Sequence, residues 1–374
     1  MSKSAVFGIV GGYGATGRVV ISELLKSCEG QLLVGGRDLA RLNSVASGFG
    51  GRVSAVRVDA MDVESLNEFC NRCSVVVNCS GPVMMLQDRV AQAARRARSH
   101  YVDLAGLSVV KERLLPYSRE ITDLGLSFVI SAGWMPGLTE LLPCYGFTRA
   151  KSEMDAVDSL NVYFSDSGEW SINALRDGLW YLRRVGLPAP RYFRKGTPVR
   201  ARMSQVYSNV DVGEPIGLRR YTLYASPELN EVGRRLTDCD VFSYTYLSGP
   251  RNALMATMIA LLPLPEKLGL RFFRNIFRRN RLPVGGFVAA HVLGQSQGRR
   301  AVLRIRVDFD AGQDYWMNGV VSATVSGMIA SGKDVRAGVH FLCDGVDPMV
   351  LMAALREAGV RQTETFELSA AAPQ

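Results

Sequence analysis

Closely spaced glycines follow a short apolar run near the start of this chain of 374 residues. The turn reads GGYGATG, and Gly12, Gly14 and Gly17 have the spacing of a dinucleotide-binding loop. In such a loop the first glycine permits a tight turn, the second lets the backbone approach a pyrophosphate, and the third lets a helix pack on the strand. The helix N-terminus then offers its amides to the phosphate charge. We therefore predict cofactor contacts along the whole turn, from Gly12, Tyr13, Gly14, Ala15, Thr16 and Gly17.

The stretch VGGRDLARL lies at the expected end of the second strand. NAD-binding folds usually have an acid there, which accepts hydrogen bonds from the adenosine ribose, but this chain has Arg37. A guanidinium can grip a 2′-phosphate bidentately, and Arg41, one helical turn later, faces the same space. The sequence therefore favours NADP(H) over NAD(H) as the cofactor. The alternative is that Arg37 is solvated at a helix start and that Asp38 reaches the ribose.

Small and polar residues at the ends of later strands complete the expected rim of the sheet. Ligands of such folds bind beyond the carboxyl ends of the strands, which predicts Asp59 and Ala60 near the adenine. The segment NCSGP is predicted to line the passage toward the nicotinamide with Ser80, Gly81 and Pro82. Asp103, in HYVDLAG, is a candidate catalytic residue on the same rim, with a capping or turn role as the alternative.

Few other side chains form a catalytic pattern, as expected if the cofactor carries the hydride and the protein only aligns the reactants and supplies a proton. His340 is a candidate proton donor because the reference pKa of histidine is near neutral, although a lone histidine can also be structural. In SDSGEWS we predict Glu169 as a catalytic candidate, and Trp170 and Ser171 as substrate contacts. The alternative is that Ser171 caps the next helix and Trp170 packs on its first turn. No metal site is expected, because the pair Cys70 and Cys73 has no second pair to complete it.

An alternation of apolar and helical runs must position these residues. Over roughly the first 130 residues, short runs rich in Val, Leu and Ile alternate with helical patterns. This pattern predicts an α/β fold with a doubly wound (Rossmann) parallel sheet. The expected strands are AVFGIV, QLLVG, RVSAVRV, SVVVNC, YVDLA and LSFVISA, and the expected helices cover residues 15–27, 38–47, 62–72, 84–98 and 109–124.

The segment SAGWMPGLTELL joins the sixth strand to a Trp-Met-Pro-Gly turn and then to a helix. Taken in order with GGYGATG, VGGRDLARL, NCSGP and YVDLAG, it resembles the saccharopine dehydrogenase family over residues 5–145. The resemblance implies an N-terminal NAD(P)-binding domain, a substrate domain and hydride chemistry. Residues 318–360 are similar to the closing segment of such proteins, which packs back against the nucleotide domain.

The Trp-Met-Pro-Gly turn also bears on the substrate. Amino-acid-handling members of the family commonly have an acid just before the Pro-Gly pair, where this chain has Trp134 and Met135. We predict that both residues contact a substrate less polar than saccharopine. The leading hypothesis is NADPH-dependent reduction of a C=N bond in an amino-acid-derived or secondary-metabolite imine. The alternatives are reduction of a C=C bond in a carrier- or membrane-bound acyl chain, and a non-catalytic NADP-binding regulator.

Longer strands such as SLNVYFS and RAVLRIRVDFD replace the helix-strand alternation after about residue 150. They predict an α+β substrate domain with a mixed sheet. We place the Rossmann domain at 1–133, the substrate and dimerisation domain at 134–314, and a C-terminal return segment at 315–374. A homodimer is expected by analogy, because extended sheets of substrate domains often pair.

Residues 270–281 form a pattern of their own within the second domain. Helix geometry places apolar residues on one side (Leu270, Phe272, Phe273, Ile276 and Phe277) and basic residues on the other (Arg271, Arg274, Arg278, Arg279 and Arg281). This basic amphipathic helix is predicted either to dock on an anionic membrane or an acidic carrier protein, or to close the core of its own domain.

Composition limits the partners and the location. The formal net charge of +9 permits phosphate-bearing ligands and anionic surfaces, whereas the sequence contains no nucleic-acid recognition module. The seven scattered cysteines and the absence of a signal-peptide pattern predict a reduced, cytoplasmic protein. No apolar run reaches the roughly 20 residues that a membrane-spanning helix requires.

Overall fold

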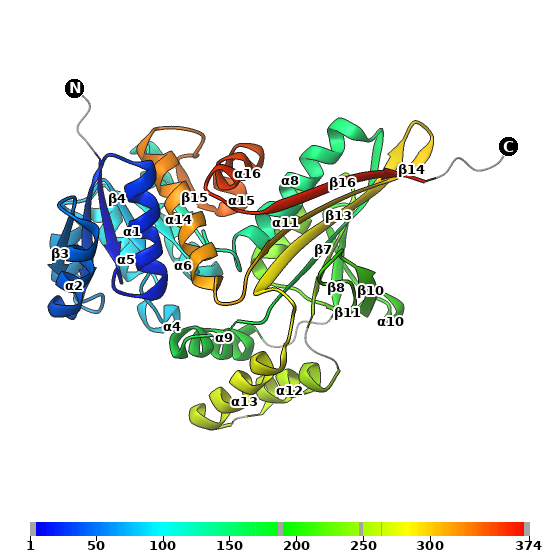
Figure 1. Cartoon of the computed structure of the whole chain (residues 1–374), viewed down its shortest axis with the longest axis horizontal. Coiled ribbons are helices and arrows are strands. Elements are labelled where there is room, and N and C mark those ends of the chain that lie inside the picture. Colours follow the sequence, from blue (N-terminus) through cyan, green and yellow to red (C-terminus); the bar gives the residue numbers. More distant parts are fainter. Residues whose placement is uncertain (1–4, 169, 186–189, 247–249, 263, 370–374) are drawn as a thin grey trace. The chain divides into compact units, whose positions relative to one another are not determined.

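The structure is a computed structural model that describes residues 5–168, 170–185, 190–246, 250–262 and 264–369 (Figure 1). The chain forms two compact units. The first comprises Met1–Leu138 and Tyr315–Gly359, and the second comprises Thr139–Asp314 and Val360–Gln374. Each unit is therefore built from two separate stretches of sequence.

Seven parallel strands form the sheet of the first unit, in the order β15-β6-β5-β4-β1-β2-β3. This is the doubly wound order, in which the winding direction reverses between β1 and β4. Residues such as Phe7, Val34 and Val76 are fully buried, as expected for a sheet covered on both faces. The prediction of a Rossmann sheet is confirmed. The strands are β1 (Val6–Val10), β2 (Gln31–Gly36), β3 (Val53–Arg57), β4 (Val75–Asn78), β5 (His100–Asp103), β6 (Ser127–Ile130) and β15 (Gly338–Phe341).

Helices connect these strands, and some are shorter than the sequence pattern predicts. The helix expected at 84–98 divides near Gln87, whose φ of 49° is incompatible with a helix. The helix expected at 109–124 divides at the 3₁₀ turn η1 (Leu115–Tyr117), which contains Pro116. The helices of the unit are α1 (Ala15–Ser27), α2 (Leu39–Phe49), α3 (Val63–Cys70), α4 (Val83–Leu86), α5 (Arg89–Arg96), α6 (Leu107–Leu114), α7 (Ser118–Asp123), α14 (Asp314–Ala330), α15 (Leu342–Gly345) and α16 (Pro348–Glu357).

A mixed nine-stranded sheet forms the second unit, with a main path β10-β11-β12-β7-β13-β14-β16. The pair β7 and β12 is parallel, and the other pairs are antiparallel. This confirms the predicted α+β architecture. The strands are β7 (Ala156–Asp166), β8 (Arg191–Arg194), β9 (Thr197–Arg200), β10 (Tyr207–Asp211), β11 (Leu218–Leu223), β12 (Asp240–Thr245), β13 (Gly286–Ser296), β14 (Arg299–Phe309) and β16 (Gln362–Leu368).

The C-terminal stretch is shared between the two sheets. β15 pairs with β6 in the first sheet, as a return segment requires, but β16 pairs with β14 in the second. We predicted that the whole segment 315–374 packs on the nucleotide domain, and the structure differs from this prediction at β16. The reason is that β14 has a free edge that β16 covers over seven residue pairs.

The helices of the second unit include a group of three that packs together. Buried Leu, Ile and Phe side chains of α9 (Ile172–Val185), α12 (Pro250–Leu261) and α13 (Glu266–Arg279) form one apolar cluster. The remaining helices are α8 (Leu138–Glu153), α10 (Met203–Val206) and α11 (Pro227–Arg235). None of the described helices is both long and apolar enough to span a bilayer.

Candidate cofactor site

The glycine turn between β1 and α1 has the geometry that its sequence predicts. The amides of Gly11 and Gly12 donate hydrogen bonds to the carbonyl of Gly35, at 2.8 and 3.1 Å, which fixes the turn against β2. A Cβ atom at Gly12 would lie 2.1 Å from Val34 Cγ1, and one at Gly17 would lie 2.6 Å from the carbonyl oxygen of Gly11. Both positions therefore require glycine, for the tight turn and for the close approach of α1 to the strand.

The start of α1 fits an anionic ligand. A Cβ atom at Gly14 would contact only the carbonyl oxygen of Gly11, at 3.2 Å, so this side of the turn is open. Gly14 is also the N-cap, no side chain caps the helix, and its first turn contains no acidic residue. The amides of Ala15, Thr16 and Gly17 are thus in the position that holds a pyrophosphate in dinucleotide-binding folds.

The end of β2 brings together an aromatic ring and a guanidinium. A Cβ atom at Gly36 would lie 2.6 Å from Tyr13 Cε1, so the absence of a side chain lets the Tyr13 ring pack on the strand end. The guanidinium carbon of Arg41 lies over that ring, 4.6 Å from its centroid. Tyr13 therefore holds Arg41 beside the position where Arg37 leaves the strand.

Arg37 and Asp38 have different roles at this point of the chain. Arg37 is exposed and makes no ion pair within the described residues. The Asp38 carboxylate instead caps α2, because its Oδ1 accepts a hydrogen bond from the amide of Arg41 at 3.1 Å. The arrangement leaves two guanidiniums for an anion and engages the Asp38 carboxylate in the helix cap, which supports a 2′-phosphate site over a ribose site.

The loops after β3 and β4 carry the other predicted cofactor residues. Asp59 Oδ1 accepts a hydrogen bond from the amide of Met61 at 2.9 Å and so closes the turn that contains Ala60. After β4, Asn78 Oδ1 accepts hydrogen bonds from both the amide and the hydroxyl of Ser80, at 3.1 and 2.5 Å. A Cβ atom at Gly11 would lie 2.9 Å from Ser80 N, so this loop lies against the glycine turn.

The loop after β4 then continues through Gly81 and Pro82 into α4, with Pro82 as its N-cap. Asn78 was not among the predicted site residues, although it stands in the quoted segment NCSGP. Its buried amide also donates a hydrogen bond to the hydroxyl of Tyr101 at 3.2 Å, which ties β4 to β5. Asn78 is thus a positioning residue that orients Ser80 at the carboxyl edge of the sheet.

Asp103 is buried at the end of β5, where it organises two loops. Its Oδ1 accepts hydrogen bonds from the amides of Gly106 at 2.6 Å and Ser131 at 2.9 Å. Burial raises the pKa of this carboxyl to about 6, although the same hydrogen bonds lower it. These contacts support the turn role, which the sequence left open, more than the catalytic role.

His340 lies on the edge strand β15, with Nε2 within hydrogen-bond distance of the carbonyl of Ala337, at 2.9 Å. Ala337 precedes the strand, so the imidazole faces its amino end. Ligands of such sheets bind at the opposite, carboxyl end. This geometry gives no support to His340 as a proton donor.

The Trp-Met-Pro-Gly turn is anchored from within the first unit. The amide of Trp134 donates a hydrogen bond to Asn318 Oδ1 of α14 at 2.9 Å, and the Trp134 side chain is buried. Met135 is half-buried. The indole of Trp134 therefore stabilises the turn, whereas Met135 remains available for the predicted substrate contact.

In the second unit, Ser171 caps α9, as the alternative interpretation of the sequence predicted, whereas Trp170 packs against a different helix, α13. Ser171 Oγ accepts a hydrogen bond from the amide of Ala174 at 3.2 Å at the start of α9. The Trp170 ring packs edge-on against Phe273, with centroids 6.1 Å apart. The third candidate of this segment, Glu169, lies outside the described residues.

A pair of acids that the sequence did not predict, the buried Asp166 and the half-buried Asp314, lies beside this segment. Asp166 Oδ2 accepts a hydrogen bond from Trp170 Nε1 at 2.8 Å, and Asp166 Oδ1 has no hydrogen-bond partner among the described residues. Burial raises the pKa of Asp166 to about 7, and the charge of Asp314 adds to the effect. The pair joins the end of β7 to the first residue of α14, and such a long-range proximity leaves no local signal in the sequence.

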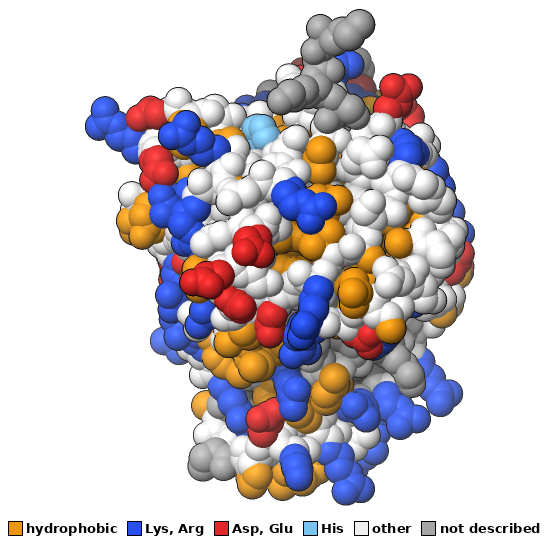
Figure 2. All heavy atoms as spheres, turned by 90° about the vertical axis from the view of Figure 1, so that its left-hand side faces the viewer, with side chains coloured by type: hydrophobic (Ala, Val, Ile, Leu, Met, Phe, Trp, Pro, Cys, Tyr) orange, Lys and Arg blue, Asp and Glu red, His pale blue; other side chains and the backbone are white. Residues whose placement is uncertain are grey.

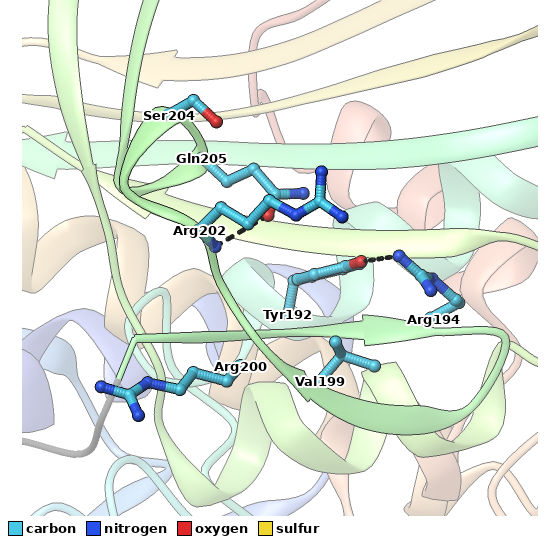
Figure 3. A pocket seen from close by; sticks show the side chains of 7 residues that line it. All are labelled: Tyr192, Arg194, Val199, Arg200, Arg202, Ser204 and Gln205. Carbon is cyan, nitrogen blue, oxygen red and sulfur yellow. Dashed lines mark hydrogen bonds between the residues drawn. The ribbon is translucent and has the colours of Figure 1, made fainter.

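A cavity of about 340 Å³ lies elsewhere in the second unit, between β8, β9 and α10 (Figure 3). Its walls include Tyr192 and the arginines Arg194, Arg200 and Arg202. Arg194 donates a hydrogen bond to the Tyr192 hydroxyl, and the Arg200 side chain points away from that pair. None of the predicted cofactor or substrate residues lines this cavity. Within the described residues, no group of His, Cys, Asp or Glu could hold a metal ion.

Comparison with known proteins agrees with this description of the first unit. Residues 7–129 match the family model described as the saccharopine dehydrogenase NADP binding domain. A solved structure, apo histidine-tagged saccharopine dehydrogenase (L-Glu forming) from Saccharomyces cerevisiae, covers 97% of this chain and 100% of its own, with a TM-score of 0.65. At 12% sequence identity this similarity shows a common fold.

Two curated relatives match a shorter stretch of 137 residues. One is the lipid droplet localized protein of Caenorhabditis elegans, at 27% identity over 34% of this chain and 32% of that protein. The other is a probable mitochondrial saccharopine dehydrogenase-like oxidoreductase of Arabidopsis thaliana, at 26% identity over 33% of this chain and 30% of that protein. The match thus spans about a third of the length of each relative.

The fold and the glycine turn define a nucleotide-binding protein of the Rossmann class. Within that class, residues 7–129 match the NADP-binding domain of saccharopine dehydrogenase. The predicted family resemblance and the predicted cofactor NADP(H) are therefore confirmed. Both findings also agree with the predicted enzyme class, a saccharopine dehydrogenase-like NADP-dependent oxidoreductase.

Proposed function

We propose that this protein is an NADPH-dependent oxidoreductase that transfers hydride to the C=N bond of an amino-acid-derived or secondary-metabolite imine. The observation that carries the proposal is the end of β2, where Arg37 and the Tyr13–Arg41 stack replace the usual acid. The imine substrate is the finer part of the proposal. It rests on the similarity of the domain and the fold to saccharopine dehydrogenase.

The residues of the first unit act by binding and alignment. The amides at the start of α1 bind the pyrophosphate, and Arg37 and Arg41 bind the 2′-phosphate. Ser80, oriented by Asn78, lies in the loop that leads toward the nicotinamide. Bound NADPH supplies a hydride to the carbon of the C=N bond, and the nitrogen takes one proton. The protein then needs no covalent intermediate, consistent with the absence of a nucleophile pattern in the sequence.

A second candidate function is reduction of the C=C bond of a hydrophobic acyl chain. It is favoured by the exposed leucine and methionine side chains of α12, which would bring the protein to a lipid surface. The name of the Caenorhabditis elegans relative, which places that protein on lipid droplets, supports the same direction. Deuterium transfer separates the two functions: NADPH deuterated at C4, as each stereoisomer, is incubated with an imine panel and with an enoyl thioester panel. Deuterium in an amine product supports imine reduction. Deuterium only in saturated acyl products refutes imine reduction and supports reduction of the acyl C=C bond.

Cofactor selectivity tests the observation that carries the proposal. Arg37→Asp removes one guanidinium and adds a repelling charge, so NADPH affinity should fall about 10- to 100-fold, whereas NADH affinity changes little. Isothermal titration of the full chain measures both. Arg72→Asp is the matched control, because Arg72 is also exposed but lies at the amino end of β4. Equal losses for the two cofactors would refute the phosphate-clamp assignment, and NADP binding without turnover on either panel would indicate a regulator.

The location and the assembly state stay proposals. We propose a cytoplasmic homodimer that acts on a small-molecule or carrier-bound substrate and does not bind nucleic acid. Size-exclusion chromatography with light scattering gives the subunit number, and fractionation of the native cells gives the location.

A further inference from the structure

The apolar face of α13 is occupied by the protein itself. Leu270, Phe273 and Ile276 are buried in a cluster with Leu175 of α9 and Ile259 of α12. The sequence offered two roles for residues 270–281, and these buried contacts correspond to closing the core of the domain. Phe272, predicted on the same apolar side, is instead exposed. Only the solvent-exposed side of α12 and α13 is therefore available for docking.

The outer side of α12 presents a row of apolar side chains to solvent. Leu254 and Leu261 are 60% and 68% exposed, and Met258 and Leu262 are also exposed. Leu254, Met258 and Leu261 are spaced by three, four or seven residues, which places them on one face of α12, and Leu262 directly follows the helix. On α13, Leu268 and Phe272, one helical turn apart, are exposed as well. We call these six residues the apolar strip.

Basic side chains accompany the apolar strip. Residues 250–281 contain seven Lys and Arg residues and one acid, Glu266. Glu266 is bonded to Arg176 of α9 at 2.9 Å, so it does not neutralise α13. The exposed basic residues have no acidic partner among the described residues: Arg251, Lys267, Arg271, Arg274, Arg278, Arg279 and Arg281. Figure 2 is turned about the vertical axis of Figure 1, so α12 and α13 lie near its lower edge. Hydrophobic and basic side chains lie beside one another there.

We propose that α12 and α13 dock this protein on an anionic lipid surface. The apolar strip enters the boundary between headgroups and acyl chains, and the arginines of α13 contact lipid phosphates. Charge complementarity selects an anionic occupant. The apolar strip selects lipid over an acidic protein, because the exposed Leu and Met side chains on one face of α12 offer no polar group that would fix the register of a protein partner. α12 is only 12 residues long, so it lies in the interface and does not cross the bilayer. This inference stands independently of the proposed reaction.

Vesicle binding tests the proposal. The full chain is sedimented with vesicles of phosphatidylcholine alone and with vesicles that contain 30% phosphatidylglycerol. We expect binding to the anionic vesicles that weakens as salt rises. Leu254→Ser with Leu261→Ser should weaken binding about tenfold or more, and so should Arg274→Glu with Arg278→Glu. Leu218→Ser is the matched control, because Leu218 is 64% exposed but lies on β11. Circular dichroism checks that each variant is folded.

An insertion probe separates lipid contact from surface attraction. Trp introduced as Leu261→Trp should shift its emission to the blue on anionic vesicles and be quenched by brominated acyl chains, whereas Leu218→Trp should not respond. No binding to anionic vesicles at low salt overturns the proposal. Loss of binding only in the arginine variant overturns the insertion of the strip. Self-association of the wild type that Leu254→Ser with Leu261→Ser abolishes, without vesicle binding, would assign the strip to contacts between copies of this chain.

Discussion

The buried carboxyl of Asp166 makes the stability of this protein depend on pH in a way that one substitution should remove. Asp166 is 4% exposed, and its pKa is about 7 in the folded chain against an ordinary value of 3.8. A raised acid pKa means that the folded state binds the proton more tightly than the unfolded state. Unfolding free energy therefore falls as pH rises from about 4 to about 7 and levels off above that pH. Asp166→Asn keeps an acceptor for Trp170 Nε1 and does not titrate.

The size of the effect follows from the two pKa values. Each unit of pKa difference corresponds to about 1.4 kcal/mol. Between pH 5 and pH 8 the wild type passes through roughly two of those units before it reaches the folded pKa, so it should lose about 3 kcal/mol relative to Asp166→Asn. Asp314→Asn should recover a smaller part of this loss, because it removes the neighbouring charge and leaves Asp166 buried.

Urea unfolding at pH 5 and pH 8, followed by tryptophan emission and circular dichroism, measures this difference. Asp123→Asn serves as the matched control, because Asp123 is an exposed acid whose side chain is 70% accessible. The reasoning is refuted if the free-energy difference between Asp166→Asn and the wild type is the same at both pH values. The reasoning is also refuted if the unfolding free energies of Asp166→Asn and Asp123→Asn change equally between pH 5 and pH 8.

Two further substitutions follow from packing. Gly17→Ala should destabilise the first unit by about 1 to 3 kcal/mol and weaken NADPH binding, since its Cβ would lie 2.6 Å from the Gly11 carbonyl oxygen; Gly48→Ala, with nothing within 4 Å, should be neutral or slightly stabilising. Phe273→Ala should cost about 3 to 5 kcal/mol by opening a cavity in the three-helix cluster, whereas Phe272→Ala at an exposed position should cost little. Thermal unfolding and NADPH titration check both pairs, and equal effects within a pair would contradict the packing assigned to it.

The cofactor site of the first unit was predictable because its signals are local. GGYGATG contains the whole turn, and Arg37 follows a strand whose Val and Leu residues are recognisable from their composition. The sequence also offered the capping role of Ser171, because the amide that it accepts from lies three residues later in the chain. It did not offer the contact of Trp170 with Phe273, because Phe273 lies on the distant helix α13. The prediction of one helix over 84–98 was wrong, because the sequence does not indicate the positive φ of Gln87 that divides it.

The acid pair of the second unit could not be predicted, because its two members are distant in sequence. Asp166 and Asp314 are separated by most of the second unit, and only the pairing of β7 with its neighbours brings them together. The same reason explains Asn318, which binds the turn at Trp134. Glu169 falls outside the described residues, and the predicted proton donors therefore stay open to kinetic test.

The pairing of β15 with β6 has a consequence for how the protein is made on the ribosome. These two adjacent strands are separated by about 200 residues of chain, which include almost all of the second unit. At ordinary rates of translation, on the order of 10 to 40 seconds pass between their synthesis. During that interval the nascent first sheet has an uncovered edge at β6, which is a template for pairing with another chain. Nascent chains stalled before Gly338 should therefore recruit chaperones more strongly than full-length chains released from the ribosome.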